Sequence, residues 1–401
     1  MYTEDLFLKP QRPVTYTGAM SRCLLCGSDR LVSDSIGVCV ECLRRDPDKA
    51  LAIVRNRRIK WRISVDLPLH PPRHDKGLRC SVCVNECVIG DGFRGYCGVW
   101  MNSGGRMRML AGSGRVLAYA YLDPIPTNCV AAHICPGSTG LGYPEYAYTP
   151  KGEYGYSNLA VFMAGCSLDC FFCQNWEHKT AISGGRIDRS VVREMSVEEL
   201  VERSLDPRIS CVCYFGGDPT PSTPMLIQAS REIIRRAREK NMIKRICWET
   251  NGLVNPLLMR EMARLSLVSG GIVKIDWKAW TPSVYEALTG VDGEKALKRL
   301  MENVRVVHEI GRERSLIPLL LVSILLVPGY VDSVEVDGVT SYIAELDPET
   351  PVVFLAFHPD HLMRDLPPTS WKHMREALRI AEKNGLKKIY IGNIWLLGDY
   401  Y

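Results

Sequence analysis

Three features are missing from this sequence, and each absence argues against a class of protein. No apolar run approaches the ~20 residues that cross a bilayer; the longest, 317–327, contains Pro318 and is expected to form a buried strand. No basic stretch followed by an apolar segment opens the chain, so we expect no secretory signal peptide and a reducing cytoplasm. No long block of like charge occurs among the 50 basic and 45 acidic residues, which gives little basis for a nucleic-acid partner.

Cysteine, by contrast, is abundant, with 16 residues in a chain of 401. In a reducing compartment, clustered cysteines indicate metal binding or redox chemistry rather than disulfides. The composition is otherwise that of an ordinary globular protein, with 46% hydrophobic and 24% charged residues. A chain of this length predicts a large catalytic domain with a smaller addition.

Composition divides the chain into three regions. Residues 1–60 hold two cysteine pairs and few apolar runs. So small a unit needs a stabilising cross-link, such as a bound metal ion, to fold. Residues 61–155 hold a second cysteine group, many glycines and little helical periodicity, which predicts a loop-rich collar. From 156 to 401, short apolar runs alternate with amphipathic segments, as in a parallel sheet or barrel.

The third region predicts an α/β fold, a (β/α)6 partial barrel of the TIM type. Helix signals agree with this: Ser196 and Glu199 form a capping box, and Thr223 is expected to be the N-cap of another helix, with Pro224 at its first position. In such barrels the functional side chains lie at the carboxyl ends of the strands. The expected strands are 159–163, 211–215, 245–249, 272–278, 317–327, 352–357 and 388–392.

The first of these strands is followed at once by three cysteines, in the spacing Cys166-x3-Cys170-x2-Cys173. Three thiolates on so short a loop can hold one face of a [4Fe–4S] cubane and leave the fourth iron open. An open position marks a catalytic centre, as it does in catalytic zinc sites. A three-cysteine zinc site is the alternative that the spacing alone leaves open.

This spacing, with Phe172 before the last cysteine, resembles the radical S-adenosylmethionine superfamily. At the end of the second expected strand, Gly216-Gly217-Asp218 is similar to the Gly-Gly-Glu motif that holds the methionine amino group of the cofactor in that superfamily, with Asp in the place of Glu. Residues 78–395 resemble the pyruvate formate-lyase activating enzymes and relatives encoded beside Memo-like and AMMECR1-like proteins. The matching stretches are 79–97, 173–177, 249–252, 276–278, 326–329, 357–359 and 365–369.

The resemblance implies a [4Fe–4S] cluster and S-adenosylmethionine as cofactors, and an electron donor of the ferredoxin or flavodoxin type. It implies that the cluster reductively cleaves S-adenosylmethionine to a 5'-deoxyadenosyl radical, which abstracts a hydrogen atom from a substrate. The residues expected to bind the cofactor are Phe172, Gly216, Gly217, Asp218, Glu249 and Asn251.

Three further residues are expected to be catalytic. On the strand 272–278, alternation places Asp276 and Lys278 on the side of Lys274, and charges that face a barrel interior indicate a ligand. By resemblance, Asp276 and Lys278 contact the cofactor carboxylate or orient the substrate; an ion pair at the rim is the alternative. His358, after the penultimate strand, is expected to reach the adenosine or the substrate, and a capped loop histidine is its alternative.

The remaining cysteines form further groups. The spacing of Cys23, Cys26, Cys39 and Cys42 is that of a zinc ribbon, for which a rubredoxin-like mononuclear iron is the alternative. The set Cys80, Cys83, Cys87 and Cys97 is equally compatible with an auxiliary [4Fe–4S] cluster and a structural zinc. Buried inert cysteines are expected at 211, 213 and 247, and Cys129, His133 and Cys135 form a looser group that is either inert or supplies ligands.

The preferred hypothesis is therefore a radical enzyme, in which the protein orients the cofactor and excludes solvent. The resemblance to activating enzymes favours a polypeptide substrate, of the glycyl-radical activating type. Modification of a lipid, an RNA or a small molecule is the alternative within the enzyme class. Outside it, the alternative is a zinc-ribbon nucleic-acid-binding protein with a structural barrel, whose binding would depend strongly on salt.

Overall fold

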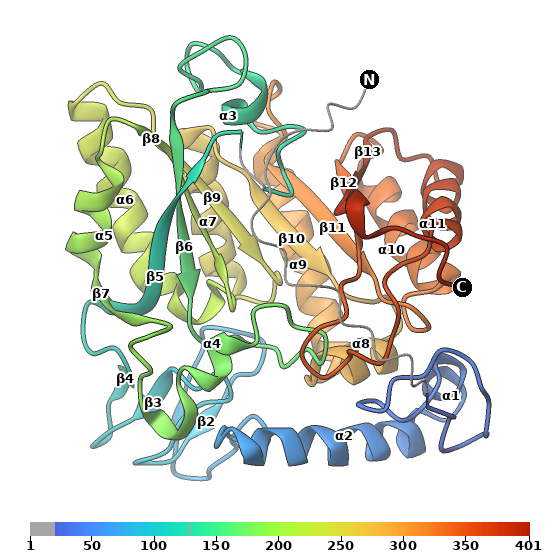
Figure 1. The fold of residues 1–401 in the computed structure, drawn as a ribbon. Helices are drawn as coiled ribbons and strands as arrows, with labels where there is room; N and C mark the ends of the chain where they lie inside the picture. Colours follow the sequence, from blue (N-terminus) through green and yellow to red (C-terminus); the bar gives the residue numbers. More distant parts are fainter. Residues whose placement is uncertain (1–20, 127–128) are drawn as a thin grey trace.

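A mixed sheet of nine strands organises the computed structural model, which describes residues 21–126 and 129–401 (Figure 1). Residues 1–20 of the expected N-terminal region lie outside the described residues. The strand order is β13-β12-β11-β10-β9-β8-β6-β5-β7. The seven strands from β13 to β6 run parallel, and they are β6 (Ser157–Met163), β8 (Ile209–Gly216), β9 (Arg245–Thr250), β10 (Val273–Trp277), β11 (Leu320–Leu326), β12 (Val352–Ala356) and β13 (Ile389–Gly392).

All seven strands that the sequence predicts are present, and the α/β partial-barrel fold is confirmed. Helices cover one face of the sheet (Figure 1). They are α5 (Val197–Ser204), α6 (Thr223–Glu239), α7 (Pro256–Ser269), α9 (Gly293–Gly311), α10 (Ser333–Leu346) and α11 (Trp371–Lys383). Further helical segments are α3 (Pro136–Thr139), α4 (Glu177–Thr180), α8 (Pro282–Thr289), η1 (Ser183–Gly185), η2 (Thr220–Ser222) and η3 (Ile394–Leu396).

Helix starts follow local chemistry. The Ser196 hydroxyl accepts from the Glu199 backbone N–H at 3.0 Å, as the capping box predicts. The start at Thr223 differs from the prediction, because Ser222 is the N-cap and makes no side-chain cap bond. The Thr223 hydroxyl instead donates to the Pro219 carbonyl, since the preceding η2 turn already supplies helical backbone there.

Two antiparallel strands extend the sheet beyond the predicted barrel. β5 (Arg115–Pro124) lies within the expected collar, yet it pairs along its length with β6 and with β7 (Arg193–Ser196). The collar is therefore not purely loops, because its residues 115–124 are built into the main sheet. Earlier in the collar, residues 78–109 form two short hairpins, β1 (Leu78–Arg79) with β2 (Val88–Ile89) and β3 (Trp100–Asn102) with β4 (Met107–Met109).

Two helices precede the collar, and both lie at one edge of the molecule. α1 (Val40–Arg45) contains Cys42 of the first cysteine group and has Cys39 as its N-cap. α2 (Pro47–Ser64) begins with a proline at its N-terminus and Asp46 as its side-chain cap. Figure 1 shows α2 along the edge of the molecule at which α4 and α8 lie. The parallel strands end toward this edge, so α2 lies on the side where functional groups are expected.

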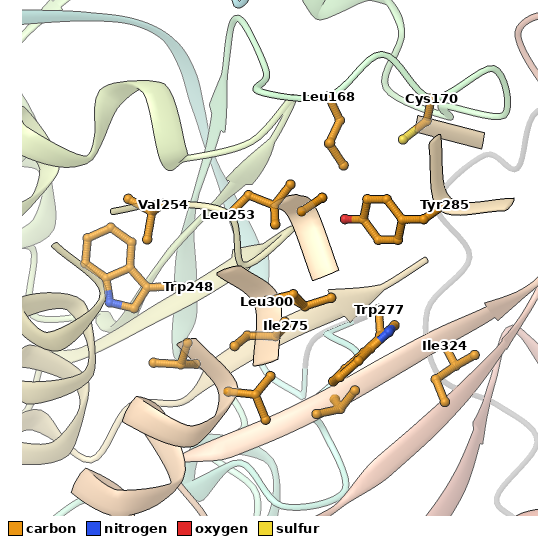
Figure 2. Close-up of a cluster of buried hydrophobic side chains, with 14 of the residues drawn as sticks. Leu168, Cys170, Trp248, Leu253, Val254, Ile275, Trp277, Tyr285, Leu300 and Ile324 are labelled. Atoms are coloured by element: carbon orange, nitrogen blue, oxygen red, sulfur yellow. The ribbon is translucent and has the colours of Figure 1, made fainter. Parts of the chain in front are cut away.

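Alternation along β10 separates the core from the barrel interior. Ile275 and Trp277 are fully buried, and Figure 2 shows them clustered with Trp248 and Leu300. Lys274 and Asp276 face the other side, as the period-two pattern predicts. The described residues contain no helix long and apolar enough to cross a membrane.

The segment from 129 to 156 is tied to the sheet by a buried ion pair. Arg245 on β9 makes two bonds to the Glu153 carboxylate, at 2.8 and 2.6 Å, and neither side chain is exposed. The Ser210 hydroxyl and the Tyr148 backbone N–H also donate to this carboxylate, so its oxygens are well satisfied. This segment therefore packs against the strands as a fixed part of the fold.

Candidate active site

The loop after β6 carries Cys166, Cys170 and Cys173, and its close packing depends on glycine. Gly165 has φ +81°, and a Cβ there would lie 2.7 Å from a methyl carbon of Val99. The loop therefore turns tightly against the collar before the first cysteine. All three thiols then line the same cavity.

Burial is the main influence on these thiols. It raises the pKa of Cys170 to about 11 and holds the pKa of Cys166 well above its usual value. Cys170 is buried, and Cys166 and Cys173 are half-buried. Thiols whose pKa is raised in this way are neutral by themselves, and a metal centre deprotonates and compensates such ligands. The residues present thus fit an iron–sulfur cluster.

One cavity of about 270 Å³ brings together every residue predicted for cofactor binding and catalysis. The contributions come from the loop after β6 and from the carboxyl ends of β8, β9, β10 and β12. A pocket of this kind is the expected place for a small-molecule cofactor. Its lining includes Cys166, Cys170, Phe172, Cys173, Gly216, Gly217, Asp218, Glu249, Asn251, Asp276, Lys278 and His358.

Gly216 at the end of β8 and Gly217 directly after it bring this strand end close to residues 166–173, the cluster loop. A Cβ on Gly216, whose φ is +105°, would lie 2.6 Å from the Met163 backbone nitrogen. A Cβ on Gly217 would lie 2.5 Å from the Gly165 carbonyl oxygen. No side chain fits at either position, so protein packing alone requires both glycines.

Asp218 lines the cavity but also ties two strand ends together. Its carboxylate accepts from the backbone N–H groups of Thr220 and Asn251, both at 2.7 Å. Burial raises the pKa of Asp218 to about 6, against these two bonds, which lower it. The Thr250 hydroxyl lies 3.4 Å from both carboxylate oxygens and can donate to one of them, which leaves the other oxygen with a free lone pair. The side chain of Asn251 donates to the Ser167 hydroxyl at 2.8 Å, which links the end of β9 to the cluster loop.

A network of two acids and two lysines forms the opposite wall. Lys274 Nζ lies 2.6 Å from Asp276 and 3.6 Å from Glu249, and Lys278 Nζ lies 3.1 Å from Asp276. Burial favours neutral lysine, but attraction to Asp276 outweighs it and raises the pKa of both Lys274 and Lys278. The same lysines hold the pKa of Asp276 far below its usual range. The charges thus balance within the wall.

His358 also lines the cavity, with its Nδ1 atom 3.9 Å from Asp360. His178 is a residue that the sequence reasoning missed: it is buried, lines the cavity, and its Nε2 lies 3.8 Å from the Cys173 sulfur. Burial lowers the pKa of His178, so its ring is neutral. Its only sequence signal is its place five residues after Cys173.

The four cysteines of the N-terminal group form a compact ligand set. Their sulfurs all lie within 4.8 Å of one another, with Cys23 3.7 Å from Cys42 and Cys26 3.8 Å from Cys39. Tetrahedral zinc with Zn–S bonds of ~2.3 Å requires sulfurs about 3.8 Å apart. The geometry therefore fits one tetrahedral ion, and four-thiolate iron fits equally.

The collar group is more widely spaced. Cys80, Cys83 and Cys87 are buried, and Cys97 is half-buried. Burial, with a smaller contribution from neighbouring thiols of the group, raises the pKa of Cys80 to about 12 and of Cys87 to about 11. Within the part of the chain that the structure describes, only the N-terminal group gathers three or more ligand atoms within 4.8 Å.

The other five cysteines converge on a second, smaller cavity inside the barrel, lined by Cys129, Cys135, Cys211, Cys213 and Cys247. The three strand cysteines are buried, as predicted. Cys211 lies 3.7 Å from Cys247, and Cys129 lies 3.4 Å from Glu249. His133 is not part of this group, because it is exposed and its ring stacks on Tyr390. Sequence spacing gave no signal of this gathering, since the thiols come from separate segments.

Comparison with known proteins places these features in context. Residues 160–336 match the family model described as the radical SAM superfamily. An uncharacterized protein of Methanocaldococcus jannaschii is 27% identical over 322 residues, which are 80% of this chain and 82% of that protein. The 7-carboxy-7-deazaguanine synthase of Methanospirillum hungatei is 26% identical over 133 residues, 32% of this chain and 50% of the enzyme. A solved domain of pyruvate-formate lyase-activating enzyme from Bacteroides vulgatus aligns with a TM-score of 0.33 and 22% identity, over 45% of this chain and 98% of that one.

Proposed function

We propose that this chain, whose residues 160–336 form a radical SAM superfamily domain, cleaves S-adenosylmethionine reductively at a [4Fe–4S] cluster held by Cys166, Cys170 and Cys173. When bound, the cluster supplies an electron that breaks the C5'–S bond of the cofactor, and the resulting 5'-deoxyadenosyl radical abstracts a hydrogen atom from the substrate. The observation that carries the proposal is the opening of these three thiols into one cavity with the ends of four parallel strands.

The residues of the cavity bind and orient the cofactor in this proposal. Asp218, which keeps a lone pair beside its bonds to Thr220, Asn251 and Thr250, accepts from the methionine ammonium, and the carbonyls beside Gly216 and Gly217 complete that site. Lys278 pairs with the cofactor carboxylate, because Asp276 retains Lys274 as a partner when Lys278 turns away.

The other wall residues receive the rest of the cofactor and the substrate. Glu249 and Asn251 face the ribose side, Phe172 supplies an apolar surface beside the cluster, and His358 is in reach of the adenine or the substrate. The electron comes from a carrier of the ferredoxin or flavodoxin type.

Electron paramagnetic resonance on the anaerobically reduced protein tests this assignment. Addition of S-adenosylmethionine is expected to change the spectrum of the cluster, since the cofactor binds at the open iron. Cys173→Ala removes a ligand and should abolish this cofactor-dependent change, whereas Cys213→Ala, a matched cysteine on β8, should preserve it. A spectrum unchanged by the cofactor would count against the assignment.

For the two other cysteine groups, we propose different metals. The N-terminal group holds a zinc ion, with mononuclear iron as the alternative, because its sulfur spacing suits one tetrahedral ion. The collar group holds an auxiliary [4Fe–4S] cluster, and the support is its burial with a spacing wider than one ion requires. Measurement of the zinc and iron content of two variants tests both assignments. Protein with Cys26→Ser should lose zinc only, and protein with Cys83→Ser should lose about four iron atoms.

A polypeptide is the proposed substrate, by the resemblance to activating enzymes. The sheet is open, with β13 and β7 as its edges, and an extended chain can approach an open sheet along a strand. Candidate partner proteins carrying deuterium at glycine Cα would be incubated with the reduced enzyme, and the 5'-deoxyadenosine weighed. Deuterium in that product supports the activating role, whereas deuterium gained only from a labelled lipid, nucleotide or side chain refutes it.

The three-part division at residues 60 and 155 remains a proposal, and the structure adds that β5 joins the collar to the barrel sheet. A reducing compartment such as the cytoplasm is proposed for the protein, because three sets of metal-binding thiols require one.

A further inference from the structure

The loop that holds the three cluster cysteines has a buried carboxylate between the first two of them. Asp169 has no exposed side-chain surface. Its carboxylate lies 2.6 Å from Lys179 Nζ, 3.5 Å from Arg62 Nη1 and 3.6 Å from Arg58 Nη1. The carboxylate is therefore enclosed by three cations.

Two of the three cations come from α2, more than a hundred residues before the cluster loop. Arg58 and Arg62 are four residues apart, so they project from the same face of the helix. The Arg58 and Arg62 side chains are 6% and 2% exposed, and burying two guanidinium groups is costly unless their donors are satisfied. The arginines therefore have a specific partner, and that partner is the cluster loop.

Arg58 contacts the loop at three points. Its Nη1 lies 3.6 Å from the Asp169 carboxylate, it donates to the Asp169 backbone carbonyl, and its guanidinium lies 3.8 Å from the ring centroid of Phe171. It also donates to the Ala287 carbonyl at 2.7 Å, at the end of α8. Loop and helix end are thus held by one side chain. Gly290 leaves the necessary room, since a Cβ there would lie 2.5 Å from Arg58 Nε.

Arg62 joins the loop to the collar. It donates to the carbonyls of Tyr96 and Pro68, and its guanidinium lies 3.8 Å from the centroid of the Tyr96 ring. Tyr96 immediately precedes Cys97 of the collar group. A planar guanidinium that makes several hydrogen bonds at once fixes the position of its partners more precisely than a lysine ammonium does.

The charges around Asp169 do not cancel. Arg58, Arg62 and Lys179 carry three positive charges against one carboxylate, which leaves a surplus of two beside the loop's thiols. In a buried setting such a surplus stabilises a bound cluster more strongly after the cluster has gained an electron.

We propose that Arg58 and Arg62 are positioning residues for the cluster loop: α2 braces the backbone of 166–173 through Asp169 and Phe171, and its two guanidinium groups shift the cluster toward easier reduction. The bracing contacts lie within the protein and do not depend on a bound cluster. The effect on reduction rests on the proposed function, because it needs the cluster.

The brace is tested first without the cluster, by hydrogen–deuterium exchange on protein whose iron has been removed while zinc is supplied. Arg58→Gln and Arg62→Gln should each speed exchange of residues 166–173 several-fold. Lys60→Gln, an exposed charge on the same helix, should leave it unchanged. Equal exchange in all three variants would overturn the brace, whether or not the protein binds S-adenosylmethionine.

The charge effect is tested by a potentiometric titration of the reconstituted cluster. Arg62→Gln should move its reduction potential to a more negative value, while Arg62→Lys, which keeps the charge and loses the fork, should stay close to the unsubstituted protein. A purely structural arginine predicts the same potential in both variants, and that result would overturn the charge effect. Should Arg62→Gln fail to fold, the Arg58→Gln and Arg58→Lys pair gives the same comparison.

Discussion

Asp218→Asn is the substitution for which the structure gives the clearest magnitude. The Asp218 side chain is buried, and burial raises its pKa from the ordinary 3.8 to about 6. Because the pKa is higher in the folded protein, this group contributes most to stability below pH 3.8, and the contribution is lost as the pH rises through 6. A rise from 3.8 to about 6 corresponds to about 3 kcal/mol, of which about half falls between pH 5 and 8.

The assay is denaturant unfolding of both proteins from pH 5 to 8, with the difference in unfolding free energy as the readout. The neutral amide has no such titration, so the unsubstituted protein should lose about 1.5 kcal/mol relative to the variant over this range. An ammonium bound at Asp218 favours the carboxylate, so S-adenosylmethionine should flatten the dependence. Parallel pH profiles without the cofactor would refute the reasoning, and a slope unaffected by the cofactor would refute the contact with its amino group.

Three other substitutions probe separate parts of the chain. Cys26→Ser should unfold the N-terminal cysteine group, since a structural ion supplies ~10 kcal/mol to so small a unit, while cofactor cleavage survives; a loss of cleavage with an intact barrel would contradict this. Lys278→Ala should weaken cofactor binding by about 1.5–3 kcal/mol in a calorimetric titration and change the melting temperature little, because Asp276 still pairs with Lys274. A lower melting temperature with unchanged cofactor affinity would indicate instead that Lys278 forms only an ion pair at the rim. Glu153→Gln should lower the unfolding free energy by about 3–5 kcal/mol, because it leaves the buried Arg245 uncompensated, and a loss under 1 kcal/mol would contradict that.

The parallel strands were predictable because their apolar runs are continuous. A strand buried on both faces needs Val, Ile and Leu throughout, and 320–326 is such a strand. β5 was missed for the opposite reason: its sequence mixes exposed tyrosine and leucine with buried alanine, and its partner strand follows more than thirty residues later. Its pairing depends on tertiary contacts that periodicity does not record.

The candidate site was predictable where the relevant residues are adjacent in sequence. The cluster loop follows β6 within a few residues, and Gly216 and Gly217 lie at the end of β8. The cations around Asp169 were not predictable, because Arg58 and Arg62 belong to a helix in a different region of the chain. For the same reason the five barrel thiols, which come from separate segments, gave no common signal.

The most direct test of the proposed chemistry is the formation of 5'-deoxyadenosine by the anaerobically reconstituted, reduced protein supplied with S-adenosylmethionine. Cys170→Ala serves as the paired variant and Cys211→Ala as the matched control, since Cys211 is buried in β8 and outside the cluster loop. We expect 5'-deoxyadenosine from the unsubstituted protein and from the control, and neither 5'-deoxyadenosine nor the iron of that cluster in Cys170→Ala. Unchanged turnover in Cys170→Ala would contradict the assignment of the cluster to this loop.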